Sequence, residues 1–243
     1  MMNRVVRTRL AGLEPLTHDI WQLTLALQPG DRFPFEAGQH AHLMFPLIGQ
    51  RAYSIASTPA ESERDGTLVF HVRAAPGGGF ARLLAESVLV DDLMVEVSGP
   101  HGDNVLDRTF TGPTLLIAGG SGLAPMLSIA EDALGRCAST QIRLMVGMRS
   151  ERDVYDEPRL KRWASASGYD AEIILSDAPA GSARRIGLIT EIIATDHADL
   201  TGWQVHVAGP PPMMNAVTQL LRERGVPEQH VHADILDAPT DRT

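Results

Sequence analysis

Cysteine is almost absent from this chain, because Cys137 is the only one among 243 residues. A single cysteine cannot form an internal disulfide, and it cannot supply the four thiolates that hold an iron–sulfur cluster. We therefore expect a reducing compartment such as the cytoplasm, and no fused iron–sulfur domain.

Basic residues and uninterrupted apolar runs are also scarce. The chain has 21 Lys and Arg against 30 Asp and Glu, a formal net charge of −9. This balance argues against nucleic acid or an anionic membrane as the main partner, because both are bound through Lys and Arg. The N-terminus lacks the apolar core of a signal peptide, and glycines and a proline interrupt the most apolar stretch, residues 114–130. We expect no membrane span.

Hydrophobic residues follow two different periods along the chain. In roughly the first hundred residues they alternate with period two, as in Leu68, Phe70 and Val72, and turn-rich segments such as residues 57–66 separate the runs. This pattern predicts half-buried strands in an antiparallel barrel or sandwich. Further on, short apolar runs alternate with helical segments, which predicts βαβ units and a parallel sheet. We therefore predict two domains, residues 1–108 and 109–243.

A glycine cluster follows the first strand of the second half, in the stretch LLIAGGSGLAP (residues 115–125). A glycine turn that opens a helix exposes backbone N–H groups and favours a phosphate. Two other interpretations stay open at this point. The turn could serve packing alone, or Ser121 could be the nucleophile of a hydrolase, although Leu123 stands where that motif has glycine.

Four motifs in order make the chain resemble the ferredoxin–NADP reductase superfamily of flavin oxidoreductases. RAYSIAS (51–57) resembles its flavin signature R-x-Y-S-x-x-S, and GGSGLAP (119–125) resembles its nicotinamide-nucleotide turn; AGPPPMM (208–214) and SGPHG (98–102) resemble two further motifs. The stretch 51–57 alone also fits an edge strand with a solvated arginine. The resemblance covers nearly the whole chain and favours the bacterial oxygenase-reductase and flavin-reductase branch. It implies an antiparallel flavin-binding β-barrel (1–108) followed by a parallel-sheet α/β domain for the nicotinamide nucleotide (109–243).

The resemblance also implies roles for individual residues. Arg51 would bind the flavin diphosphate, the Tyr53 ring would stack on the isoalloxazine, and the Ser54 hydroxyl would hydrogen-bond flavin N5, which accepts the hydride. Tyr53 and Ser54 are thus the expected catalytic residues. Further expected flavin contacts are Ser57, His71, Val72, Gly78, Gly79, Phe80, Ala81 and Asp234. The expected nicotinamide-nucleotide contacts are Gly119, Gly120, Ser121, Gly122, Pro125, Arg149, Gly209, Pro210, Pro211 and Met213.

Three positions depart from the family pattern. Ala81 replaces a Ser or Thr, Ala208 replaces a frequent Cys, and Leu236 replaces an aromatic residue expected near the flavin. The missing hydroxyl at Ala81 removes one contact to the flavin diphosphate. We keep FAD as the expected cofactor.

The implied function is an FAD-dependent NAD(P)H oxidoreductase that passes electrons to a separate ferredoxin or oxygenase component. The alternatives are a reductase of free flavin and a nucleotide-binding electron-relay subunit of a larger complex. The choice between NADH and NADPH depends on the loop after the second parallel strand. There, Arg149 and Arg152 favour a 2′-phosphate, and Glu151 and Asp153 favour a free ribose. The branch resemblance slightly favours NADH.

Two H-x-H pairs raise the question of a metal. We expect His40 and His42 to share one strand face, and His230 and His232 another. A third ligand is not evident near either pair, so no metal site is predicted.

Overall fold

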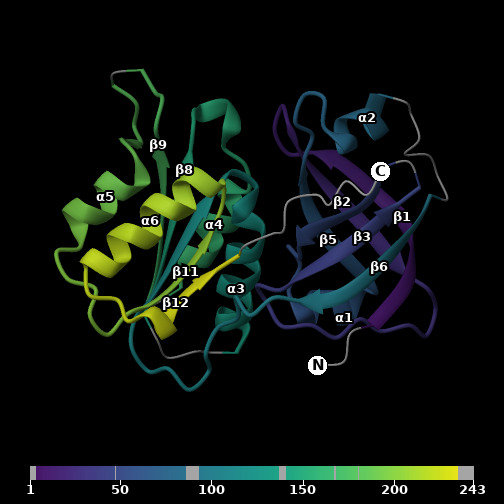
Figure 1. Cartoon of the computed structure of the whole chain (residues 1–243), viewed down its shortest axis with the longest axis horizontal. Helices are drawn as coiled ribbons and strands as arrows, with labels where there is room; N and C mark the ends of the chain where they lie inside the picture. Colours follow the sequence, from purple (N-terminus) through teal and green to yellow (C-terminus); the bar gives the residue numbers. More distant parts are fainter. Residues whose placement is uncertain are drawn as a thin grey trace.

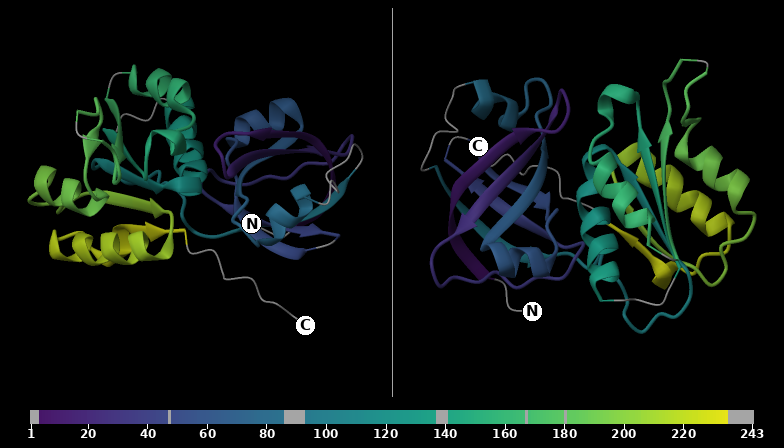
Figure 2. Two further views of the ribbon diagram at one scale, coloured as in Figure 1. Left: turned by 90° about the horizontal axis from the view of Figure 1, so that it is seen from above. Right: turned by 180° about the vertical axis from the view of Figure 1, so that it is seen from behind.

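The computed structural model describes residues 4–46, 48–85, 93–136, 141–166, 168–179 and 181–234. These residues form an antiparallel sheet followed by a parallel sheet, and the two lie side by side (Figures 1 and 2). The predicted fold class is therefore confirmed. We call residues 4–101 the barrel half and residues 114–234 the α/β half. In the described part of the chain, no helix combines the length and apolarity needed to cross a membrane.

The barrel half is built on six antiparallel strands in the order β4-β3-β6-β1-β2-β5. An isolated bridge between Ile55, just after β4, and Phe70 in β5 brings the two edge strands together and curves the sheet into a half-barrel. The strands are β1 (Arg4–Pro15), β2 (Ile20–Leu27), β3 (His40–Phe45), β4 (Gly49–Ser54), β5 (Thr67–Arg73) and β6 (Met94–His101).

Period-two alternation correctly predicts the core of this half. The side chains of Leu68, Phe70 and Val72 are fully buried, as are Ala41 and Leu43 on β3. Because alternate residues of a strand project to one face, these side chains point into the same core.

Residues 57–66, predicted as a turn, instead contain helix α1 (Pro59–Asp65), so that prediction is wrong. Thr58 and Glu61 form a capping box, Pro59 occupies the first turn, and Gly66 ends the helix in the left-handed region at φ 65°. Each feature stabilises a helix terminus. A second short helix, α2 (Gly79–Ala85), opens within the glycine-rich segment 77–79.

The α/β half has six parallel strands in the order β10-β9-β8-β7-β11-β12. Its strands are β7 (Thr114–Gly119), β8 (Ile142–Met148), β9 (Tyr169–Leu175), β10 (Arg185–Ile186), β11 (Gln204–Ala208) and β12 (Val231–Ala233). Its helices are α3 (Leu123–Gly135), α4 (Glu157–Ala164), α5 (Ile189–Asp196) and α6 (Pro211–Glu223). Short 3-10 turns are η1 (Gly120–Gly122), η2 (Glu151–Asp153) and η3 (Glu228–His230).

Helices cover both faces of this parallel sheet. Leu116 of β7 packs in one cluster with residues of α3 and α4, whereas Leu115 and Ile117 pack in another with residues of α5 and α6. Figure 1 shows α3 on the side nearest the barrel half. A buried hydrogen bond of 2.8 Å from the Ser128 hydroxyl on α3 to the Ser57 carbonyl joins the two halves. This contact helps to fix the halves relative to each other.

Candidate functional site between the two halves

Strand β4 presents the predicted flavin motif on two faces. Arg51 and Tyr53 are two residues apart and project from the same face, whereas Ser54 projects from the other. The Tyr53 ring packs edge-on against Phe45, with centroids 6.5 Å apart. Burial raises the pKa of Tyr53 to about 12, so its phenol is neutral at physiological pH. The Arg51 guanidinium donates to the Gln50 carbonyl at 2.8 Å.

Ser54 connects the barrel half to the end of the α/β half. Its hydroxyl donates a hydrogen bond to the carboxylate of Asp234, which directly follows β12. The Asp234 N–H donates to the Val207 carbonyl at 2.9 Å and extends the pairing of β12 with β11. Burial raises the pKa of Asp234 to about 6, although the Ser54 hydrogen bond acts in the opposite direction. The flavin motif therefore meets a carboxyl group that titrates closer to neutral pH than an ordinary aspartate.

A cavity of about 380 Å³ lies between the two halves at this contact. It brings together residues predicted to bind the flavin and residues predicted to bind the nicotinamide. From the barrel half it is lined by Ala52, Tyr53, Ser54, His71 and Arg73. From the α/β half it is lined by Ser121, Gly122, Ala208, Gly209, Pro211, Met214, Asn215 and Asp234.

The two turns on the α/β side of this cavity pack directly against each other. A Cβ atom on Gly122 would lie 2.2 Å from the Ala208 carbonyl oxygen, and one on Gly119 would lie 2.5 Å from the Met213 sulfur. Both distances are shorter than any real contact. The clash at Gly122 is with backbone, so only glycine fits there, whereas at Gly119 the flexible Met213 side chain would have to move. The glycine cluster thus has a packing role in addition to any ligand.

A second cavity, of about 570 Å³, opens at the carboxyl ends of the parallel strands. Ligands of open α/β sheets bind at these ends, where the strand order reverses. Here β7 has β8 on one side and β11 on the other, which is such a reversal. Predicted residues lining this cavity are Gly119, Gly120, Arg149, Pro210 and Met213.

The charges around this second cavity are mostly paired. Glu151 is held by Arg184 at 3.0 Å, and Arg149 lies 3.6 Å from Asp177. Arg152 also lines the cavity. The carboxylate of Glu151, which the sequence suggested as a ribose ligand, is therefore engaged with another arginine.

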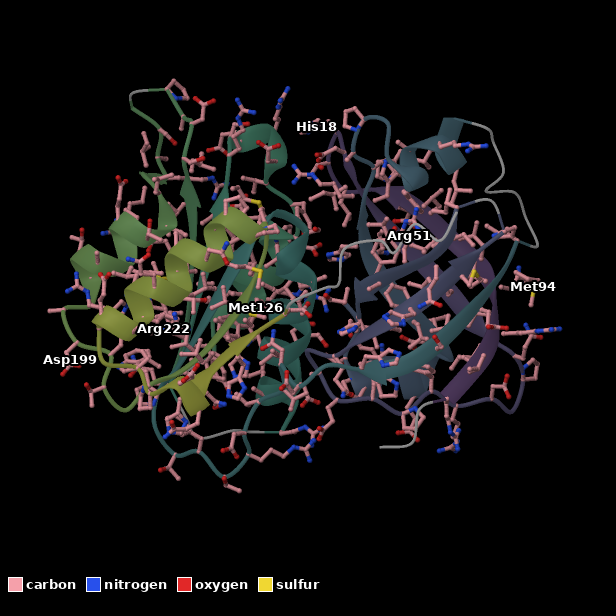
Figure 3. All side chains as sticks on the ribbon, in the orientation of Figure 1. His18, Arg51, Met94, Met126, Asp199 and Arg222 are labelled. Atoms are coloured by element: carbon pink, nitrogen blue, oxygen red, sulfur yellow. The ribbon has the colours of Figure 1, made fainter. Side chains whose placement is uncertain are left out.

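The barrel half reaches this second cavity through the loop between β1 and β2. Arg73 of β5 lines both cavities and donates from Nε to Asp19 at 2.7 Å. His18 Nδ1 lies 3.6 Å from an Asp153 carboxylate oxygen. Figure 3 shows His18 at the barrel edge that faces the α/β half, with Arg51 farther inside the barrel half.

Several predicted site residues line neither cavity. Arg51, Gly78, Gly79, Phe80 and Ala81 lie around the start of α2 or on β4, and Phe80 is buried against Phe45 with ring centroids 6.2 Å apart. These five residues therefore lie outside both cavities.

Ser57, Val72 and Pro125 also line neither cavity, and all three are buried. The Ser57 hydroxyl accepts from the Val69 N–H at 3.2 Å. Leu236 lies outside the described residues.

Sequence reasoning missed residues that shape the site, above all Arg73 and Tyr155. Arg73 shares the strand face of His71, so alternation could have placed it beside the crevice. The buried Tyr155 hydroxyl donates to the Gly120 carbonyl at 3.0 Å and holds the glycine turn. Tyr155 also contacts the His71 ring edge-on, with centroids 5.4 Å apart. Burial lowers the pKa of His71 to about 3, so this imidazole is neutral.

The two H-x-H pairs differ from each other. His40 and His42 do share one face of β3. His230 ends the 3-10 turn η3 before β12 begins, so the prediction that His230 and His232 share a strand face is wrong. His232 instead stacks on His206, with centroids 4.7 Å apart.

Known proteins match both halves of the chain. Residues 7–105 match the family of oxidoreductase FAD-binding domains, and residues 116–219 match that of oxidoreductase NAD-binding domains. A relative from Ralstonia sp, the ferredoxin–NAD(P)(+) reductase component of naphthalene 1,2-dioxygenase/salicylate 5-hydroxylase systems, is 37% identical over 95% of this chain and 69% of its own. The reductase subunit of an Amycolatopsis aromatic O-demethylase is 36% identical over 82% of this chain and 60% of its own. The chain thus spans about two thirds or less of the length of these relatives.

Solved structures give the same result. A cytochrome P450 reductase from Amycolatopsis superimposes with a TM-score of 0.84 at 32% identity, covering 95% of this chain and 69% of that one. The ferredoxin reductase of carbazole 1,9a-dioxygenase has the same fold, with a TM-score of 0.82 at 24% identity over 96% of this chain and 70% of that one. The chain belongs to the ferredoxin–NADP reductase superfamily of flavin oxidoreductases, with an FAD-binding and an NAD-binding domain. This membership does not support the alternative of a hydrolase with Ser121 as nucleophile.

Proposed function

We propose that this chain is an NAD(P)H oxidoreductase in which residues 1–108 bind FAD and residues 109–243 bind the nicotinamide nucleotide. The 380 Å³ cavity is the observation that carries this proposal, because Tyr53 and Ser54 stand on one wall and Gly122 and Gly209 on the other. Hydride transfer requires the reacting atoms to approach within about 3–3.5 Å. A cavity with one predicted binding motif on each wall supports such an approach.

The residues on the barrel side fit a flavin. Tyr53 offers a flat, neutral ring, Ser54 offers a hydroxyl for flavin N5, and Arg51 offers a planar fork for the diphosphate on the face that it shares with Tyr53. The amides around Gly78 and Gly79 would hold the rest of the diphosphate. Ala81 cannot add a hydroxyl contact, which costs about 0.5–1.5 kcal/mol of flavin binding.

The residues on the other side fit a nicotinamide nucleotide. The glycine turn exposes backbone N–H groups at the start of α3, where a phosphate is favoured. Arg73, Arg149 and Arg152 line the adjoining 570 Å³ cavity and supply positive charge for the phosphates of the nucleotide. Arg149 and Arg152 would favour the 2′-phosphate of NADPH. We nevertheless keep the slight preference for NADH, which comes from the resemblance to the oxygenase-reductase branch.

The bound flavin would supply the redox chemistry, which is to accept a hydride and release its two electrons singly. The chain positions the rings and excludes water. Tyr53 would hold the flavin ring, and Ser54, which is hydrogen-bonded to Asp234, would hold a proton at N5. The hydride step itself needs no general base.

We also propose that the electrons leave to a separate protein, a ferredoxin or an oxygenase component. The relatives named above are reductase components or subunits of oxygenase and demethylase systems, which supports this acceptor class. The scarcity of cysteine supports a cytoplasmic location. Free flavin is the alternative acceptor.

The function is tested with purified protein after incubation with FAD. Anaerobic mixing with NADH or NADPH should abolish the visible flavin absorbance, and a panel of iron–sulfur proteins and free FMN should then identify which acceptor restores it. A protein that takes up no FAD, or a flavin that neither nucleotide reduces, contradicts the proposal. Restoration by free FMN alone would favour the flavin-reductase alternative.

A further inference from the structure

Asp156 has an unusual backbone conformation at the start of α4. Its φ of 54° and ψ of 18° lie in the left-handed region, and among the described residues it is the only one other than glycine with a positive φ. An aspartate in this position usually caps the helix with its side chain, but the Asp156 side chain makes no such hydrogen bond. Left-handed backbone is unfavourable for a residue with a side chain and persists only where the surroundings impose it. The side chain is thus held for a contact other than a helix cap.

The Asp156 carboxyl group faces His71 of the barrel half. Asp156 Oδ2 lies 3.8 Å from His71 Nε2, which is longer than the usual hydrogen-bond distance of about 2.7–3.2 Å. Both atoms are buried, and in the described part of the chain neither has a hydrogen-bond partner. A buried polar atom without a partner costs free energy. Two such atoms therefore face each other where the halves meet.

The contact open to these two groups is a single hydrogen bond. Burial lowers the pKa of His71 to about 3, and the charge of Arg159 acts in the same direction. Burial also raises the pKa of Asp156, although Arg159 lowers it. A charged imidazole is thus disfavoured, which argues against an ion pair. A neutral imidazole donates or accepts at Nε2 according to its tautomer, so it can bond to either form of the carboxyl group.

The residue before Asp156 connects this pair to the nucleotide side. The Tyr155 hydroxyl donates to the Gly120 carbonyl at 3.0 Å, and the Tyr155 ring contacts His71 edge-on. Tyr155 and Asp156 are adjacent in the chain, so a nucleotide that moves the glycine turn also moves the Asp156 carboxyl group. The segment therefore links the predicted nucleotide site to a predicted flavin contact.

We propose that Asp156 is a positioning residue for hydride transfer, which forms a hydrogen bond with His71 when a bound nicotinamide nucleotide draws the two halves together. The proposal rests on the proposed function. The reacting atoms must approach within about 3–3.5 Å, so their spacing is sensitive to a small shift of the halves. A shift of about 1 Å brings Oδ2 and Nε2 within hydrogen-bonding distance. A nucleotide that binds the closer arrangement better shifts the protein toward it. Asp156 lines neither cavity, so it acts on the rings through His71 and Tyr155.

Three substitutions separate this hydrogen bond from the fold. Asp156→Gly removes the carboxyl group and keeps the backbone unstrained, because glycine adopts the left-handed region readily. Asp156→Asn keeps a polar group of the same length that can bond to an imidazole, and asparagine also tolerates this backbone. His71→Phe keeps a flat ring without nitrogen atoms. The FAD-loaded single variants and the double variant D156G/H71F are compared with the wild type.

Binding of NAD⁺, measured by isothermal titration, tests the contact. D156G and H71F should each bind NAD⁺ about three- to tenfold more weakly, which is the effect of one hydrogen bond. The double variant should bind no more weakly than the single variants, because each substitution removes the same interaction. D156N should bind as the wild type. Losses that add up in the double variant, or a D156N as weak as D156G, would overturn the contact.

Unfolding and reduction test the closing movement. Urea unfolding without nucleotide should show no coupling between the two positions, because the hydrogen bond is absent there. At saturating NADH, reduction of the flavin should be about three- to tenfold slower in D156G and normal in D156N. Coupling of equal size with and without nucleotide would show a static contact and overturn the proposal.

A further measurement follows His71 directly. With ¹⁵N-labelled histidine, the Nε2 resonance of His71 should shift on addition of NAD⁺ in the wild type and in D156N, and shift less in D156G. Equal shifts in the three proteins would contradict the proposal. Failure of the FAD-loaded wild type to bind either NAD⁺ or NADP⁺ would instead refute the proposed function, on which the proposal rests.

Discussion

The Ser54 hydroxyl donates a hydrogen bond to the Asp234 carboxylate, and this contact joins β4 of the barrel half to the end of β12 in the α/β half. The same hydroxyl lines the cavity in which we place the two reacting rings. The Ser54 side chain therefore contacts the α/β half and lines this cavity at the same time. Substitutions around it give direct tests.

Removing the hydroxyl with Ser54→Ala should slow the reduction of bound flavin by NADH. The loss of one hydrogen bond, worth about 0.5–1.5 kcal/mol, corresponds to a decrease of up to about tenfold. The pKa of Asp234 should rise further, because the Ser54 hydrogen bond lowers it. Ser54→Thr keeps a hydroxyl and serves as the control in rapid-mixing experiments. Equal rates in all three proteins would contradict the role of Ser54.

The buried Asp234 predicts a pH-dependent stability. The pKa of Asp234 in the folded protein is about 6, above its usual 3.8. Asp234 therefore adds fully to the free energy of unfolding below pH 3.8, and this contribution is lost as the pH rises through 6. Asp234→Asn removes this loss. The free energy of unfolding of the variant, relative to that of the wild type, should therefore be about 2–3 kcal/mol higher at pH 8 than at pH 4. Urea unfolding of both proteins at the two pH values measures the difference. A constant difference would show that Asp234 has an ordinary pKa.

Arg73 should contribute to nucleotide binding, because it lines both cavities. Arg73→Ala should weaken binding of NAD⁺ by about 1.5–3 kcal/mol, the range for a hydrogen bond to a charged group. Isothermal titration gives the affinity. Arg7→Ala is a suitable control, since Arg7 is exposed on β1 and lines neither cavity. Equal affinities for both variants would exclude Arg73 from the site.

The glycine turn should not tolerate a side chain. Gly122→Ala would place a methyl group 2.2 Å from the Ala208 carbonyl oxygen, so it should lower the free energy of unfolding by about 1–3 kcal/mol and impair nucleotide binding. Gly135→Ala, at the other end of α3, meets no atom within 4 Å and should be neutral or stabilising by up to about 1 kcal/mol. Denaturant unfolding distinguishes the two. A fully stable G122A would show that the two turns can separate without cost.

Arg149 and Arg152 should control selectivity for the 2′-phosphate. Replacing both with Ala should reduce kcat/KM for NADPH more than for NADH, because only NADPH carries the additional anionic group. Both arginines line the cavity, and the carboxylate of Glu151 is paired with Arg184. A parallel loss for both nucleotides would assign the arginines to the phosphates that the two nucleotides share.

The sequence could predict the two-part fold because the apolar period changes from two in the first half to the βαβ pattern in the second. It could not predict α1, although Thr58, Pro59 and Glu61 were visible, because a polar segment with Pro and Gly is also typical of a turn. The alternation is also less regular in strand β1. A register shift between Leu10 and Gly12 disturbs its alternation with β2, and Thr8 occupies a fully buried position.

Site residues that belong to a sequence motif could be predicted, whereas contacts between segments far apart in the chain could not. Tyr53, Ser54, Gly122 and Gly209 do line one cavity. The direct packing of Gly122 on Ala208 could not be read from the sequence, since it joins positions far apart in the chain. The same is true of His40 and Asp234, whose proximity depends on how the halves are placed.

The most direct test of the central claim is a single anaerobic turnover of the FAD-loaded protein with NADH deuterated at nicotinamide C4. If the two rings lie face to face in the crevice between the halves, the visible flavin absorbance disappears and the rate falls when the transferred hydrogen is deuterium. A flavin that keeps its absorbance with NADH and with NADPH would contradict the account.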